Sequence, residues 1–305
     1  RDHAVDHRAS IARRRVRIAI NAPTSSTFIH KAQVIFIKKG FRDMSLTEQQ
    51  AIQHTISNHV AVVTMNNPPA NTWTSQSLTA LKELVLALND NKDVYALVLT
   101  GCGEKFFSAG ADLKLFADGD KAVALEMARI FGEAFETLSA FRGVSIAAIN
   151  GYAMGGGLEV ALACDIRVAE EQAVLALPEA KVGLLPCAGG TQNLTALVGE
   201  GWAKRIILCG EQVGAAQARE LGLVEEVVVK GGALNKAIEL AESVANQSPS
   251  SVTACKALIQ NMRSAPLKHG LIKERELFLN LFDTEDQTEG VCAFLEKRKP
   301  NWKNQ

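Results

Sequence analysis

Short apolar segments alternate with helical segments after residue 44, and this alternation constrains the fold more than any other feature of the chain. The stretch from His59 to Met65 is short and rich in β-branched residues, as a strand is. After an Asn- and Pro-rich turn, leucine and valine recur at helical spacing from Ser75 to Asn89. Apolar strands that alternate with helices predict an α/β protein with a largely parallel sheet.

The same alternation continues toward the C-terminus. We expect further strands at 94–100, 144–149, 166–169, 174–177 and 224–229, and further helices at 122–141 and 158–163. Beyond residue 229 the pattern is helical throughout, over 233–246, 250–262, 271–282 and 284–297. Leu277, Leu281 and Phe282 are apolar positions that look exposed, so this helical tail is expected to serve as an oligomer contact or a lid.

The first 43 residues differ from the rest in charge. They carry ten Lys or Arg side chains against three Asp, whereas residues 44–305 carry 23 basic and 30 acidic side chains. The segment is either a mitochondrial transit peptide or a non-native upstream extension before Met44. The acidic body disfavours nucleic acid as a partner, because nucleic-acid binders depend on clustered Lys and Arg. We divide the chain into this extension at 1–43, a core at 44–245 and a C-terminal helical region at 246–305.

Cysteine and apolar patterning bear on the compartment. The six cysteines lie far apart without a CxxC pair, which favours free thiols in a reducing compartment. No stretch reaches the eighteen uninterrupted apolar residues of a membrane span, so we expect a soluble protein. We place it in a bacterial cytoplasm, or in the mitochondrial matrix if the first 43 residues are a transit peptide.

Histidine is missing from the centre of the chain, since none lies between His59 and His269. This excludes a Ser-His-Asp triad, a Cys-His pair or a His-rich zinc site built from that stretch, and we expect no metal site. Proton chemistry near neutral pH would therefore fall to Asp or Glu side chains.

Two glycine-containing segments follow predicted strands. The loop at 105–112 (KFFSAGAD) is either an ordinary strand-to-helix turn or a place where backbone N–H groups approach a ligand. The segment at 150–165 (NGYAMGGGLEVALACD) places a glycine triplet at the start of an apolar helix. Its spacing fits neither a dinucleotide fingerprint nor a phosphate loop. Free N–H groups at a helix N-terminus favour negative charge, including an oxyanion that forms during a reaction.

Two glutamates stand among apolar neighbours close to this triplet. Glu159 is flanked by leucine, valine and alanine, so its pKa should be raised unless it satisfies free N–H groups in the first turn. Glu179 follows Pro178 twenty residues later in a similar setting. If the β-rich connection brings them together, they form a carboxyl pair with separate acid and base roles.

These segments closely resemble the crotonase, or enoyl-coenzyme A (CoA) hydratase/isomerase, family. The resemblance runs from about Asn58 to the C-terminus and is carried by FSAGAD at 107–112, NGYAMGGGLEVALACD at 150–165 and LPEAKVGLLPCAGGTQ at 177–192. It implies a crotonase-type spiral of ββα units with a helical C-terminal oligomerisation region. It also implies a homotrimer or a dimer of trimers.

The resemblance implies a reaction and the groups that perform it. The N–H groups of Ala109 and Gly156 would form an oxyanion hole for a thioester carbonyl. Glu159 and Glu179 match the two glutamates of a hydratase, which adds water to a trans-2-enoyl-CoA to give 3-hydroxyacyl-CoA, as in fatty-acid β-oxidation. The isomerases of the family typically keep one glutamate, so the presence of both favours hydration. Δ3,Δ2-enoyl-CoA isomerisation or another acyl-CoA reaction of the family is the alternative.

The resemblance also implies substrate contacts. No separate cofactor is expected, because CoA is part of the acyl-CoA substrate. The adenine end of CoA would lie along residues 111–113, and its nucleotide would contact the last helix, often that of a neighbouring subunit. The positions implied as substrate contacts are Ala109, Gly110, Ala111, Asp112, Leu113, Gly156, Phe294 and Lys297. Lys297 also reads as a solvated charge in a basic run.

The sequence departs from the family pattern at two positions, and one alternative function is not enzymatic. Cys187 stands where the family usually has glycine and would reshape the wall near Glu179, and Trp73 in NPPANTW would alter acyl-chain preference. A non-enzyme alternative is an RNA-associated relative that uses the basic segment up to Arg42.

Overall fold

The larger sheet has six strands and the predicted parallel character. The structure is a computed structural model that describes residues 51–305, so the interpretation of residues 1–43 lies outside the described residues. The strand order is β1-β2-β3-β5-β7-β10. The strands span Ile52–Ser57, Val60–Met65, Ala96–Gly101, Val144–Ile149, Ile166–Glu170 and Glu226–Val228. All neighbours after the first pair are parallel, which confirms the sequence prediction.

The first pair forms a hairpin that the sequence did not predict. β1 and β2 are antiparallel, and the two residues between them, Asn58 and His59, have φ values of 50° and 66°. Positive φ at both central residues suits the tight turns that match strand twist. β1 lies at the sheet edge and is largely exposed, which is why it lacks the apolar pattern of the buried strands.

A second sheet of four very short strands accompanies the first. Its order is β4-β6-β8-β9, and the strands span Phe106–Ser108, Tyr152–Met154, Val174–Ala176 and Val213–Gly214. β4 and β6 are parallel neighbours, as are β6 and β8. This small sheet therefore brings together the chain segments that lead into the two predicted glycine loops and toward Glu179.

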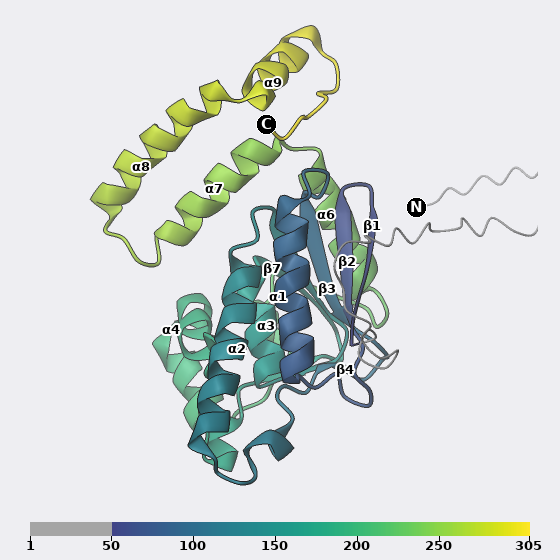
Figure 1. Cartoon of the computed structure of the whole chain (residues 1–305), viewed down its shortest axis with the longest axis vertical. Coiled ribbons are helices and arrows are strands. Elements are labelled where there is room, and N and C mark those ends of the chain that lie inside the picture. Colours follow the sequence, from purple (N-terminus) through teal and green to yellow (C-terminus); the bar gives the residue numbers. More distant parts are fainter. Residues whose placement is uncertain (1–50) are drawn as a thin grey trace, which may run out of the picture. The chain divides into compact units, whose positions relative to one another are not determined.

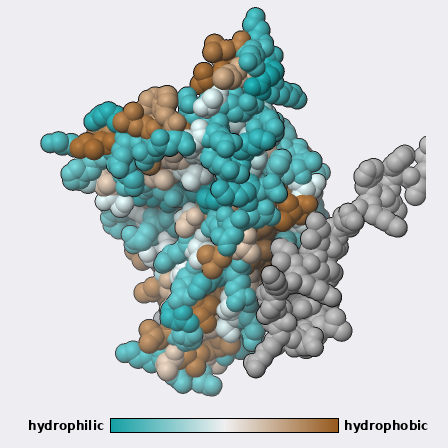
Figure 2. All heavy atoms as spheres, turned by 45° about the horizontal axis from the view of Figure 1, so that its top comes forward, coloured by the Kyte–Doolittle hydropathy of each residue, from teal (hydrophilic) through white to brown (hydrophobic). Residues whose placement is uncertain are grey.

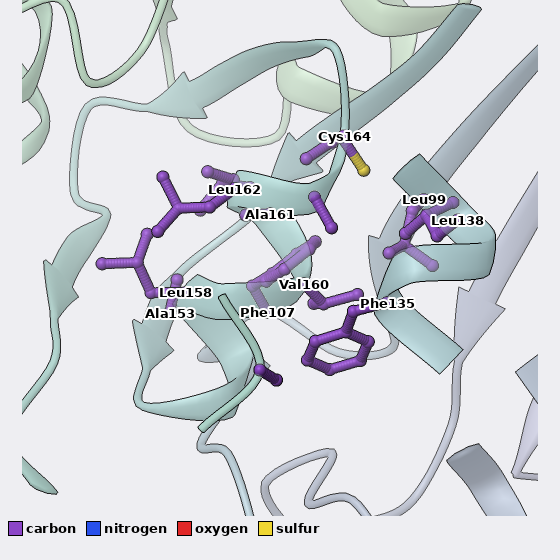
Figure 3. Close-up of a cluster of buried hydrophobic side chains, with 14 of the residues drawn as sticks. Leu99, Phe107, Phe135, Leu138, Ala153, Leu158, Val160, Ala161, Leu162 and Cys164 are labelled. Atoms are coloured by element: carbon purple, nitrogen blue, oxygen red, sulfur yellow. The ribbon is translucent and has the colours of Figure 1, made fainter. Parts of the chain in front are cut away.

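Helices cover both faces of the larger sheet (Figure 1). α1 (Ser75–Asp90), α2 (Lys121–Ser139) and α3 (Gly156–Ala163) share the larger apolar core, and α6 (Ala233–Ala245) packs on the opposite face. Every residue of α3 is buried, and Figure 3 shows Leu158 and Val160 pointing to different sides of this helix. A helix surrounded in this way holds its N-terminus in a fixed place.

Three further helices follow the core. α7 (Pro249–Asn261) is fastened to it by Lys256, whose Nζ donates to the Gly143 carbonyl at 2.9 Å and pairs with Asp165 at 2.7 Å. α8 (Leu267–Asn280) buries no side chain, and α9 (Glu285–Glu296) buries two. Figure 2 shows one face of the whole molecule, on which several apolar patches are exposed. Over residues 51–305 no helix is both long and apolar enough to cross a membrane.

The last residues of the chain return to the core. Asp286 is 1% exposed and accepts from the backbone amides of Lys303 and Asn304 at 2.8 and 3.0 Å. The Asn304 side chain in turn donates to the Lys92 carbonyl at 2.7 Å and accepts from Arg142 at 3.2 Å. These bonds join the end of the chain to α9 and to the segment before β3.

Candidate active site

The glycine triplet at the start of α3 allows two close approaches. A Cβ on Gly157 would lie 2.1 Å from the Ser108 carbonyl oxygen, and one on Gly155 would lie 3.1 Å from Glu179 Oε1. Gly155 also has φ 53° and ψ −126°, a backbone conformation open essentially to glycine alone. The triplet thus lets the end of β4 and the Glu179 carboxyl both pack against the N-terminus of α3.

The loop after β4 meets this turn as expected. A Cβ on Gly110 would lie 3.0 Å from the Gly156 nitrogen, and Gly110 has φ 87°. The loop is held from the other side by Trp73, whose N–H donates to the Gly110 carbonyl at 2.8 Å and whose carbonyl accepts from Asp112 at 3.3 Å. The loop at 105–112 and the glycine turn at 155–157 therefore lie against each other.

The prediction that Ala109 supplies an oxyanion donor is wrong in this structure. Its N–H donates to the Ala70 carbonyl at 2.9 Å, and the next N–H, that of Gly110, donates to Ser108 Oγ at 3.2 Å. Among the described residues, the N–H groups of Ala111 and Gly156 have no protein acceptor. Ala111 and Gly156 are therefore free donors, one on each loop.

Glu159 is buried in the first turns of α3, and its carboxylate reaches another helix. Its side chain is 3% exposed, and Oε1 accepts from the backbone amides of Ala188 and Gly190 at 2.8 and 3.0 Å. α4 (Gly190–Leu208) begins at the second of these residues. The pKa of Glu159 is raised overall, because burial raises it more than the two amide hydrogen bonds lower it.

Glu179 opens a short 3-10 helix, η3 (Glu179–Val182), which follows β8. Burial, and to a smaller extent the nearby charge of Glu159, raise its pKa to about 7. Its Oε2 atom is buried and has no hydrogen-bond partner in the described structure. Glu159 is thus near enough for its charge to act on Glu179, and the two carboxyls differ in their partners, since Glu159 Oε1 has two amide donors and Glu179 Oε2 has none.

Cys187 belongs to the same wall. It precedes Ala188, which binds Glu159, and the residue is exposed. Partial loss of solvation, together with the charges of Glu159 and Glu179, raises the pKa of its thiol to about 11. The sequence prediction that this side chain lies near Glu179 agrees with that electrostatic influence.

Other predicted contact residues lie in two places. Asp112 caps η2 (Leu113–Phe116) by accepting from Lys114 at 3.1 Å, and Leu113 is half exposed on that turn. Phe294 lies on α9 and is largely exposed, and Lys297 ends the helix with φ 56°. In the single described chain α9 packs on α7 and η4 (Leu281–Asp283), away from the glutamate pair (Figure 1).

Sequence reasoning missed the role of Asn71. Its φ is 51°, and its side-chain amide donates to the carbonyls of Cys102 and Phe106 at 2.9 and 3.0 Å. Its own carbonyl accepts from Ser108 Oγ at 2.7 Å. The available signal was the NPPAN turn, which suggested a tight bend without indicating what the bend supports. Within residues 51–305 no group of three His, Cys, Asp or Glu side chains is placed to hold a metal ion.

Comparison with known proteins gives a consistent result. The family model for enoyl-CoA hydratase/isomerase matches residues 55–305. The 2,3-dehydroadipyl-CoA hydratase of Escherichia coli is 40% identical over 80% of this chain and 95% of its own length. The short-chain-enoyl-CoA hydratase of Clostridium acetobutylicum is 37% identical over 79% and 92%. The solved structure of Pseudomonas aeruginosa DspI is 59% identical, with a TM-score of 0.83, over 87% of this chain and all of its own.

Proposed function

The chain belongs to the enoyl-CoA hydratase/isomerase family, and from this premise we propose that it adds water to trans-2-enoyl-CoA to give 3-hydroxyacyl-CoA. The crotonase-type fold expected from the sequence is confirmed. The observation that carries the proposed reaction is the pair of carboxyls, buried Glu159 in α3 and half-buried Glu179 beside Gly155, which differ in environment.

The thioester oxygen is held by the N–H groups of Ala111 and Gly156. Both donors lie on backbone fixed by neighbouring elements, and neither is used by another described residue. As water attacks Cβ, the π electrons of the double bond move toward the thioester oxygen, where the two N–H groups stabilise the developing charge. Removal of one such donor typically costs about 10²- to 10³-fold in rate.

The two glutamates divide the proton transfers. Glu159 accepts a proton from the attacking water, because burial raises its pKa and so makes it a stronger base than a free carboxylate, while the amides of Ala188 and Gly190 hold it in place. Glu179 gives a proton to Cα, because a pKa of about 7 keeps much of this carboxyl protonated near neutral pH. The water oxygen is already bonded to Cβ from the attack, and the electron pair returns from the thioester oxygen to form the new Cα–H bond. Glu159 is left protonated and Glu179 ionised, and exchange of one proton between the carboxyls and solvent restores the starting state.

The CoA portion is proposed to lie along Ala111, Asp112 and Leu113. We propose that copies of the chain assemble as trimers or pairs of trimers, so that Phe294 and Lys297 meet the nucleotide of a neighbouring subunit's substrate. This assembly is supported by α8, whose apolar side chains are exposed in the single chain; they include Leu267, Phe278 and Leu279.

Turnover of crotonyl-CoA by Glu159→Gln and Glu179→Gln tests the proposal. Each variant is expected to lose about 10²- to 10⁴-fold in hydration rate, the usual contribution of a positioned acid or base. Glu170→Gln is the matched control, because Glu170 is equally buried but accepts from Gln172 and Ala233 outside the site. Hydration at near wild-type rate by Glu159→Gln would exclude the assigned role. Turnover of a 3-enoyl-CoA without hydration would identify an isomerase instead.

A further inference from the structure

Two buried side-chain atoms lack a hydrogen-bond partner in the described part of the chain, and both border the glycine turn. They are Trp73 Nε1 and Glu179 Oε2. A Cβ on Gly156 would lie 3.5 Å from Trp73 Cδ1, the ring atom bonded to Nε1, and one on Gly155 would lie 3.1 Å from Glu179 Oε1. Glu179 already has a proposed task there, whereas the indole N–H has none.

The surroundings of the Trp73 ring do not require an N–H. The ring is 1% exposed and packs edge-on against Phe135, with centroids 5.5 Å apart, and Phe135 packs edge-on against Phe131. A phenylalanine would share these contacts without burying an unpaired donor, and buried donors without partners are destabilising. By contrast, Trp302 Nε1 donates to the Asn246 carbonyl at 3.2 Å.

We propose that Trp73 is a substrate-contacting residue whose indole N–H donates to an oxygen of the acyl thioester. The inference rests on the proposed function. Trp73 also binds Gly110 and Asp112 through its backbone, so its ring is fixed relative to both Ala111 and Gly156. One polar donor in an otherwise apolar wall is the usual means by which a site orients a ligand. The acceptor is either the thioester oxygen itself or an oxygen farther along the acyl chain.

The test compares Trp73→Phe with wild type in two measurements. Thermal unfolding of the free enzyme should show a cooperative transition for Trp73→Phe, in which removal of the unpaired donor offsets part of the stability lost with the smaller ring. Calorimetry should show about 3- to 10-fold weaker binding of acetoacetyl-CoA, the loss expected for one hydrogen bond. Butyryl-CoA, whose acyl group has only the thioester oxygen, distinguishes the two possible acceptors. Equal weakening for both ligands identifies the thioester oxygen, and weakening for acetoacetyl-CoA alone identifies the acyl-chain oxygen.

Trp302→Phe is the matched control, because it removes an N–H that has a partner. Its Tm should fall and its affinity for both thioesters should stay unchanged. Unchanged affinity of Trp73→Phe for both ligands would overturn this inference and leave the proposed reaction intact. Failure of the wild-type enzyme to bind either thioester would instead overturn the proposed function.

Discussion

The carboxylate of Glu159 is bound by the first amide of another helix, since the Gly190 N–H donates to Oε1 at 3.0 Å. This contact joins α3 to α4 at the centre of the site. A Cβ on Gly190 would lie 2.9 Å from the same oxygen and 2.8 Å from Pro186 Cβ. The carboxylate therefore occupies space that only glycine leaves open.

Gly190→Ala should reduce hydration without removing either glutamate. The added methyl group forces Glu159 away from the amides that hold it, and small displacements of a reacting group can cost about 10²-fold in rate. Steady-state turnover of crotonyl-CoA measures this loss. Gly201→Ala in the same helix is the control, because a Cβ there meets nothing within 4 Å. Equal activity of the two variants would show that Glu159 does not depend on this contact.

Glu179→Gln should change how stability varies with pH. The folded-state pKa of Glu179 is about 7 against an ordinary value of 4.5, so the folded protein binds this proton more tightly than the unfolded chain does. The stability that this group contributes is fully present below about pH 4.5 and is lost as pH rises through 7. The Tm of the variant minus that of wild type should therefore increase between pH 4.5 and 8. A difference that stays constant with pH would contradict the raised pKa.

Lys256→Met should loosen the attachment of α7. The substitution leaves Asp165 without its ion partner and leaves the Gly143 carbonyl without its donor, and both groups are largely buried. Loss of one partner of such a pair costs about 3 kcal/mol in the free energy of unfolding. Urea denaturation measures it. Lys204→Met is the control, because it removes an exposed ion pair with Glu200, one turn earlier in α4. It should lower the free energy of unfolding by less than ~0.5 kcal/mol.

Cys187 should react slowly with iodoacetamide at pH 8. The thiolate is the reactive form, and partial loss of solvation together with the two glutamates raises the pKa of this thiol to about 11. Glu179→Gln removes one of the charges and should make alkylation of Cys187 faster, as followed by peptide mass spectrometry. The same rate in the variant and in wild type would indicate that the carboxyl does not influence the thiol.

The sequence predicted the parts of the fold that are buried along their whole length. The segment 144–149 is the strand β5, and the helix expected at 75–89 is α1 with one residue more. Each is apolar at all but one of its buried positions, so local pattern and burial agree. β4, β6 and β9 have two or three residues each, which is too short for any period to be visible.

In the candidate site, too, the sequence predicted what depends on local pattern and missed what depends on distant segments. Glu159 and Glu179 could be selected because charge among apolar residues is costly and therefore informative. The donor assigned to Ala109 was wrong because the direction of its N–H is set by the Ala70 carbonyl, 39 positions earlier in the sequence. Hydrogen bonds between distant segments leave no trace in a local motif, and the same holds for the three carbonyls that Asn71 binds.

The fastening of Asn304 to Asp286 and Lys92 has a practical consequence for protein engineering. A purification tag or fluorescent reporter fused directly after Gln305 would begin one residue from a side chain that is 8% exposed. It would disturb the hydrogen bonds by which Asn304 connects α9 to the segment before β3. A flexible spacer of glycine and serine inserted before the tag would leave these hydrogen bonds intact.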